Sequence, residues 1–141
     1  MSVHTETVVI ECHPSVVVQI LRDVGGLAHW LPGVRAVAAP PARPARTGDR
    51  VDAFAADGSP VSLRYAAVAP DLVSVEATGR RIGELATWRV QPSLFGCSVQ
   101  LTVEHPSAGP VVFSRNGSEP GSRPSALRDH VLDHVGMRLP A

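Results

Sequence analysis

Lysine is absent from this chain of 141 residues, whose 13 basic residues are all arginines. Schiff-base chemistry, pyridoxal phosphate enzymes and Walker-type phosphate loops each require a lysine, so the composition excludes these three classes. The 13 acidic residues bring the formal net charge to zero. A balanced charge argues against nucleic-acid binding, which rests on clustered positive charge, and against a polybasic membrane surface.

Long apolar runs and a targeting segment are absent as well. No run approaches the roughly 20 apolar residues that a membrane helix needs. The first residues, MSVHTETVVIE, lack the basic start and apolar core of a signal peptide, so we expect a cytoplasmic protein. The two cysteines, Cys12 and Cys97, fit no metal motif. In the cytosol we expect them to be reduced thiols.

What is present is typical of one globular domain over residues 1–141, with 44% hydrophobic and 18% charged residues. The Val- and Thr-rich residues 3–11 predict a strand. Residues 14–24 predict a short helix, because proline suits the first turn and apolar residues follow at i, i+3, i+4 and i+7. Residues 27–31 repeat part of this spacing and predict a second small helix that ends at Pro32.

From residue 34 onwards the apolar residues alternate with a period of two, which predicts strands separated by turn dipeptides. The predicted strands are residues 34–39, 50–56, 60–69, 72–79, 84–92 and 97–105. A loop over residues 106–124 then leads to a predicted terminal helix, residues 125–139. The apolar face of this helix consists of Leu127, Val131, His134 and Val135.

The order of these elements resembles the START-like (SRPBCC) superfamily, the helix-grip fold that includes polyketide cyclases and dehydrases. Its N-terminal signature is matched by a proline-led helix, an aspartate and a W-x-P-G pattern, and three later strands also fit. The residues that carry the resemblance are Asp23, Trp30, Pro32, Gly33, Tyr65, Trp88 and Gly96. The resemblance covers nearly the whole chain.

The resemblance implies an α+β fold in which a curved seven-stranded antiparallel sheet wraps around the C-terminal helix. Two short helices lie between the first and second strands, and a cavity between sheet and helix holds an apolar or aromatic ligand. The first and last strands pair in this fold, which implies that Cys12 and Cys97 lie near each other. The terminal helix is usually long in the family but has about fifteen residues here. The cavity is therefore either more open or closed by a second copy in a homodimer.

Strand alternation predicts which side chains face this cavity. It places Tyr65, Ala67 and Trp88 inside, whereas Arg64 and Arg89 face outward. The predicted ligand-binding residues are Trp30, Leu63, Trp88, Val99, Leu101, His130 and Val131. Apolar walls with a few polar groups are typical of small-molecule sites. The alternative interpretation is that the aromatic residues simply fill the core.

Few polar groups are expected to reach this pocket, and three are candidates to move protons: Tyr65, His105 and His134. His130 and His134 have the i, i+4 spacing of metal ligands, but a zinc site needs three or four ligands. The glutamate of the HExxH motif is also missing, because Val131 follows His130. We therefore expect no metal and no other cofactor.

The residues leave two main functions open. The first is a polyketide cyclase or dehydrase-like enzyme of secondary metabolism, in which the pocket bends a hydrophobic or aromatic substrate so that it cyclises or loses water. The second is a non-catalytic protein that binds, transports or sequesters a hydrophobic small molecule, as in self-resistance. Aromatase-cyclases of the family tend to place arginines inside the pocket, and the alternation predicts none on the corresponding strands. A co-chaperone-like interaction domain is a third hypothesis.

Overall fold

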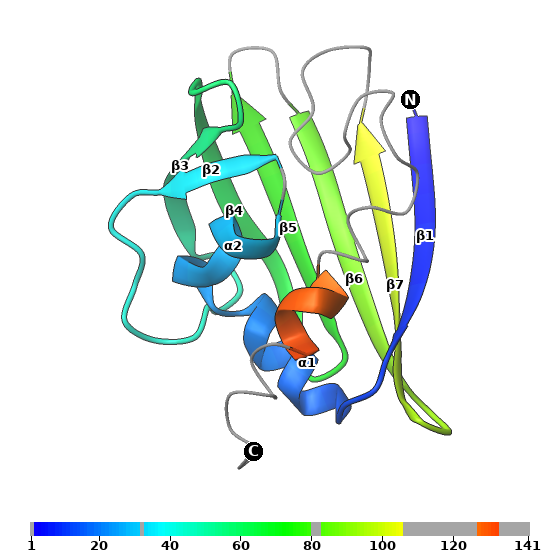
Figure 1. The fold of residues 1–141 in the computed structure, drawn as a ribbon. Coiled ribbons are helices and arrows are strands. Elements are labelled where there is room, and N and C mark those ends of the chain that lie inside the picture. The colour runs from blue at the N-terminus through cyan, green and yellow to red at the C-terminus, as the bar shows by residue number, and fades with distance from the viewer. Residues whose placement is uncertain (1, 32, 80–82, 106–126, 133–141) are drawn as a thin grey trace.

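The computed structural model describes residues 2–31, 33–79, 83–105 and 127–132. Within these residues seven strands form one curled antiparallel sheet in the order β1-β7-β6-β5-β4-β3-β2 (Figure 1). The strands are β1 (Ser2–Ile10), β2 (Val34–Val37), β3 (Arg50–Ala55), β4 (Pro60–Ala69), β5 (Leu72–Gly79), β6 (Gly83–Ser93) and β7 (Gly96–His105). The predicted seven-stranded antiparallel sheet is therefore confirmed.

Short helices connect β1 to β2 and lie over one face of the sheet (Figure 1). They are α1 (Pro14–Leu21), the 3-10 helix η1 (Val24–Gly26) and α2 (Leu27–Trp30). The ring of His13 caps α1 by accepting a hydrogen bond from the backbone N–H of Ser15 (3.1 Å), and Pro14 occupies the first turn. Helix α1 packs against β5 and β6, and α2 packs against β2. The two predicted helices are confirmed, and the turn of 3-10 helix between them is an addition.

The first and last strands pair along the whole of β1, from Ser2 opposite His105 to Ile10 opposite Cys97. Gly96 makes this close approach possible where β7 begins. Its φ of 144° is unfavourable for other residues, and a side chain there would collide with the backbone of Ile10 and of residue 11. The pairing that the resemblance implied is confirmed.

Residues 127–132 are helical and form the described part of the predicted terminal helix. Leu127 and Val131 are completely buried, as the helical spacing predicts. Arg128 Nη2 donates to both carboxylate oxygens of Glu11 (3.0 and 3.2 Å), which ties this segment to the end of β1. His134 and Val135 lie outside the described residues.

Two strands depart from the predicted pattern. β2 ends at Val37 instead of residue 39, because Ala39 adopts a positive φ of 45°. In β4 a bulge between Tyr65 and Ala67 shifts the register with β5, and the alternation of buried residues stops at Tyr65. The prediction that Ala67 continues the buried face is therefore wrong, because the bulge changes the local parity of the strand.

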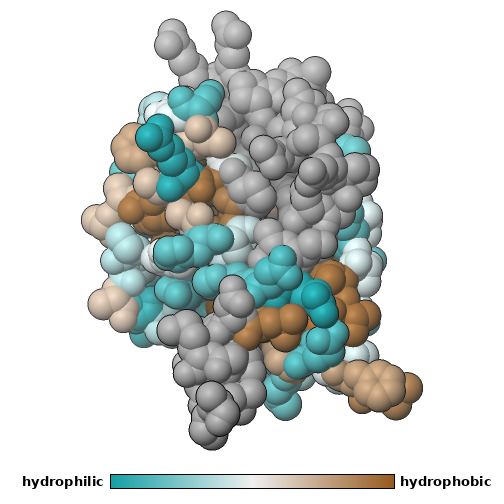
Figure 2. Space-filling model, viewed as in Figure 1, coloured by the Kyte–Doolittle hydropathy of each residue, from teal (hydrophilic) through white to brown (hydrophobic). Residues whose placement is uncertain are grey.

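Most large apolar side chains lie between the helices and the sheet, but the turn between β6 and β7 is an exception. Leu94 is 94% exposed and Phe95 is 81% exposed. Figure 2 shows a hydrophobic projection at the lower right, where Figure 1 draws this turn. The chain thus has a buried apolar core on the concave face and a small apolar tip far from it.

Candidate functional site

The side chains of β4 and β6 face as their alternation predicts. Tyr65 is 1% exposed and Trp88 is 2% exposed on the concave face. Arg89 is exposed, and Arg64 extends its Nε to Glu76 Oε1 (3.4 Å) outside the core. The remaining buried members of the predicted ligand-binding set are Trp30, Leu63, Val99, Leu101 and Val131. The structure therefore brings these residues from five elements into one core.

Two indole rings meet at the centre of this arrangement. Trp30, the last residue of α2, and Trp88, in the middle of β6, pack edge to face with ring centroids 5.6 Å apart and planes at 80°. This geometry is favourable for aromatic pairs. Trp88 lies opposite Val73 on β5 and Leu101 on β7, so its strand neighbours on this face are apolar. We call Trp30, Tyr65 and Trp88 the aromatic cluster.

Trp30 carries a polar atom that lacks a partner. Its Nε1 is buried, and no acceptor within the described parts of the chain hydrogen-bonds to it. Buried N–H groups in native proteins are almost always paired with protein, water or ligand. Core packing alone does not explain this donor.

Tyr65 has a different environment. Its hydroxyl donates a hydrogen bond to the carbonyl of Leu21 at the end of α1 (3.3 Å). Burial raises the pKa of Tyr65 well above its ordinary value, and the nearby carboxylates of Asp23 and Asp49 raise it further. The phenol therefore stays neutral at physiological pH and can act as a hydrogen-bond donor but not as a base.

The three histidines of the predicted site differ in how much of each the structure describes. His130 is half-buried on the helical segment 127–132, and its ring stacks on that of His29 from α2, with centroids 6.0 Å apart and planes at 3°. His105 ends β7 opposite Ser2, where its backbone is described but its side chain is not. His134 lies outside the described residues. The contact between His29 and His130 was not predicted, because it joins two elements about 100 residues apart.

Sequence reasoning also missed a buried carboxylate. Glu84 is only 3% exposed, and it precedes Trp88 by four residues on β6. The alternation that places Ala86, Trp88 and Val90 on the concave face places Glu84 there too. The signal was therefore present in the sequence, but glutamate is rarely buried and was not considered.

Cys12 and Cys97 lie together, as the pairing of the first and last strands implies. Cys97 is fully buried and Cys12 is partly exposed, and each thiol influences the pKa of the other. Burial is the main cause that raises the pKa of both thiols, to about 11 for Cys97. Both cysteines are free thiols.

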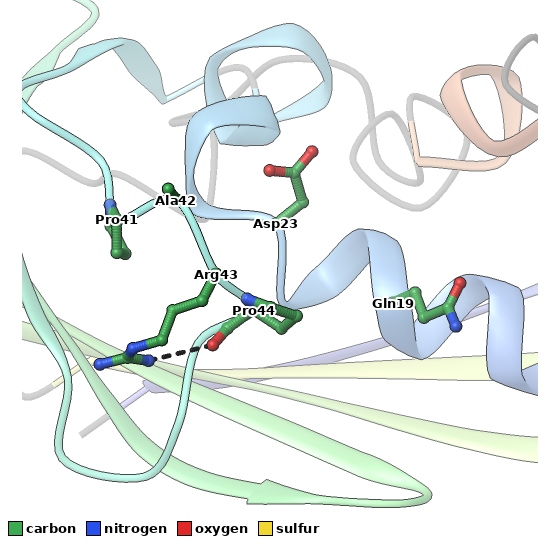
Figure 3. A pocket seen from close by; sticks show the side chains of 6 residues that line it. All are labelled: Gln19, Asp23, Pro41, Ala42, Arg43 and Pro44. Carbon is green, nitrogen blue, oxygen red and sulfur yellow. Dashed lines mark hydrogen bonds between the residues drawn. The ribbon is translucent and has the colours of Figure 1, made fainter.

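A groove of about 310 Å³ lies on the surface beside α1 (Figure 3). It is lined by Gln19, Asp23, Pro41, Ala42, Arg43 and Pro44. The guanidinium of Arg43 turns back to the carbonyl of Pro44 (3.1 Å) and to the carboxylate of Asp49 (2.8 and 3.1 Å). Arg43 is the main cause that lowers the pKa of Asp49 to about 2. No pattern in the sequence predicted this groove.

The described ranges contain neither a cluster of metal ligands nor a membrane-spanning helix. Across the described ranges, no three His, Cys, Asp or Glu side chains converge as a metal site requires. None of the helices in those ranges has the length and apolar character needed to cross a membrane.

A comparison with models of protein families matches residues 1–123 to the family described as polyketide cyclase / dehydrase and lipid transport. The chain belongs to this family. The resemblance inferred from the order of strands and from the W-x-P-G pattern is thereby confirmed. A comparison with curated proteins finds no match.

Solved structures of this fold come from several bacteria. XoxI from Bacillus cereus is 16% identical, with a TM-score of 0.65 over 96% of this chain and 99% of that one. An Aha1 dimer from Colwellia psychrerythraea is 13% identical, with a TM-score of 0.58 over 96% of this chain and 93% of that one. DynU16, a protein of the dynemicin biosynthetic locus, is 18% identical, with a TM-score of 0.56 over 95% of this chain and 44% of that one. At these identities the likeness establishes the fold.

Proposed function

We propose that this family member binds a hydrophobic or aromatic small molecule beside the aromatic cluster and directs its cyclisation or dehydration. The observation that carries the proposal is the cluster itself, in which buried aromatic side chains from α2, β4 and β6 belong to one core on the concave face. Aromatic walls with few polar groups are typical of small-molecule sites. The family description and the origin of DynU16 in a biosynthetic locus support the same chemistry. The proposal treats residues 1–141 as one ligand-binding domain.

In this proposal the protein promotes the reaction mainly through the shape of its binding site. A flexible poly-carbonyl chain held against aromatic walls brings a carbanion carbon close to a distant carbonyl, which lowers the entropic part of the barrier. The neutral Tyr65 hydroxyl stabilises the developing enolate oxygen by moving its hydrogen bond from Leu21 to the substrate. Proton transfer is assigned to His105 and His134, because the pKa of histidine lies near neutrality. No cofactor takes part.

A non-catalytic carrier or sequestering protein is the alternative, and one observation favours it. The Tyr65 hydroxyl is already engaged by the backbone carbonyl of Leu21, and its raised pKa makes it a poor proton donor. Most of the described residues of the predicted site are apolar. A carrier needs only such a surface, whereas an enzyme needs at least one group that exchanges protons with the ligand.

We also propose that a second copy can complete the site. The structural neighbour from Colwellia psychrerythraea was solved as a dimer. Native mass spectrometry of the free protein measures this directly, and a monomer at micromolar concentration would contradict the proposal.

The central experiment is native mass spectrometry with a panel of aromatic polyketides and reactive poly-carbonyl compounds, followed by product analysis. An enzyme is expected to return at least one compound with altered mass or connectivity. Tyr65→Phe, which removes one hydroxyl, is expected to abolish this turnover and to leave binding nearly unchanged. Thr102→Val on the outward-facing side of β7 is the matched control, because it also removes one hydroxyl and should preserve turnover.

Three outcomes separate the functions. Turnover that is lost in Tyr65→Phe and kept in Thr102→Val supports the enzyme. Binding without chemical change supports the carrier. Failure of every compound to bind at the aromatic cluster, with Trp88 fluorescence unchanged in a Trp30→Phe background, would contradict both functions.

A further inference from the structure

The unpaired donor of Trp30 points to a specific feature of the ligand. Trp30 is 3% exposed and its Nε1 is shielded from solvent, yet no described residue supplies an acceptor. An indole nitrogen can only donate a hydrogen bond. A buried donor without a partner is costly, so the position favours any bound molecule that supplies an oxygen or nitrogen lone pair.

The surroundings of this N–H explain why the protein does not satisfy it. The ring of Trp30 packs edge to face with Trp88, whose neighbours across the sheet are Val73 and Leu101. None of these side chains contains an acceptor of ordinary strength. At the end of α2, the backbone carbonyl of Leu27 accepts from the N–H of Leu31 (2.9 Å).

The charges on the strands indicate a neutral acceptor. The strand arginines Arg50 and Arg89 are exposed, and Arg64 pairs with Glu76 outside the core. Among the described strands, none of these cations reaches the concave face to balance a carboxylate or phosphate. A buried anion without a cationic partner is strongly unfavourable. A carbonyl or phenol oxygen, in contrast, suits a single neutral N–H donor.

We propose that Trp30 Nε1 is the hydrogen-bond donor that orients a planar, carbonyl-bearing ligand against the ring of Trp88. This inference rests on the proposed function and specifies its ligand: an aromatic or conjugated ketone with its oxygen directed at α2. Trp30 is a positioning residue in this assignment.

The test compares anthrone with 9,10-dihydroanthracene, in which a methylene group replaces the carbonyl. Their dissociation constants are measured by calorimetry with the full chain and with Trp30→Phe and Trp88→Phe. Wild type is expected to prefer anthrone by about tenfold, because one hydrogen bond to an otherwise unpaired buried donor has about this value. Trp30→Phe should lose this preference. Trp88→Phe, the matched control, should weaken both compounds and keep their ratio.

A second measurement does not depend on the folding of any variant. The chain has two tryptophans, so its proton–nitrogen correlation spectrum contains two indole signals. Anthrone is expected to shift the Trp30 indole proton downfield, as a new hydrogen bond does, and 9,10-dihydroanthracene is expected to leave it nearly in place. Equal affinities with no selective shift would overturn the inference and leave the proposed function intact. Failure of both compounds to bind would overturn the inference, whereas the proposed function is tested by the full panel of compounds described above.

Discussion

The aromatic cluster and the surface groove beside α1 differ in whether their polar atoms have hydrogen-bond partners. In the groove, Arg43 donates to both carboxylate oxygens of Asp49 and to the carbonyl of Pro44, so its charge is compensated within one loop. In the cluster, Tyr65 has a backbone acceptor but Trp30 Nε1 has none among the described residues. The groove is open to solvent, whereas the cluster is closed off from it.

This difference indicates in which of the two regions a ligand gains the most binding free energy. An exposed ion pair is screened by water and contributes little, so a molecule in the groove competes with interactions that already exist. The free energy of a buried donor in an apolar environment depends strongly on whether it has a hydrogen-bond partner. The concave face, more than the groove, therefore offers binding energy that the free protein does not use.

The largest effect is expected on β6, where adjacent residues point to opposite faces. Trp88→Ala should lower the free energy of unfolding by about 3–5 kcal/mol, because it removes a buried aromatic side chain and leaves a cavity. Arg89→Ala should change it by less than about 0.5 kcal/mol, because Arg89 is exposed. Urea denaturation measures both values. Similar losses in the two variants would show that β6 has no buried face at this position.

A medium effect is expected from the hydroxyl of Tyr65. Tyr65→Phe should cost about 1 kcal/mol at pH 7, because the carbonyl of Leu21 loses its donor. The pKa of Tyr65 is raised in the folded state, so the unfolded chain releases this proton first as pH rises above about 10. Wild-type stability should therefore fall above that pH more steeply than that of Tyr65→Phe. Parallel curves from pH 7 to 11 would contradict the buried position of the hydroxyl.

A small effect is expected at the groove, and it should disappear in acid. The hydrogen bond from the Arg43 side chain and, to a smaller extent, that from the backbone N–H of Arg46 lower the pKa of Asp49 to about 2. The stabilisation by this carboxylate is present above its unfolded pKa of about 4 and is lost as pH falls towards 2. Asp49→Asn should thus be slightly less stable than wild type at pH 7 and equal to it near pH 2. Thermal melts at both values test this, and a gap that persists at low pH would count against the ion pair.

No effect on ligand affinity is expected from the groove. Arg43→Ala should bind anthrone as tightly as wild type does, because Arg43 lies in a surface loop and its donors are satisfied there. Calorimetry alongside Trp30→Phe provides the comparison. A weaker complex for Arg43→Ala than for Trp30→Phe would move the candidate site from the aromatic cluster to the groove.

Local patterns in the sequence predicted a large part of this structure. The period of two placed Tyr65 and Trp88 inside and Arg64 and Arg89 outside, and exposure confirms each of them. The same pattern failed at Ala67, because the bulge after Tyr65 is set by the pairing with β5 and leaves no local signal. It would have identified Glu84 had the alternation been applied without regard to residue type.

Contacts between distant segments could not be predicted in the same way. The groove depends on how the loop around Arg43 folds back over α1, and the stacking of His29 on His130 joins α2 to the helical segment 127–132. The proximity of Cys12 and Cys97 was predictable because the family resemblance specified which strands pair. Residue spacing alone carries no such information.

The sequence by itself determined the composition-based exclusions, the order of elements and the face on which most strand residues lie, because alternation and helical spacing are properties of neighbouring residues. Only the tertiary structure decided what each inward polar group contacts. Tyr65 was expected to present its hydroxyl to a cavity, and it donates instead to Leu21, 44 residues earlier. Trp30 was expected to be an apolar wall, and its N–H is the group left without a partner among the described residues. Hydrogen-bond partners depend on which segments the curled sheet brings together, and this is settled only when the whole chain is packed.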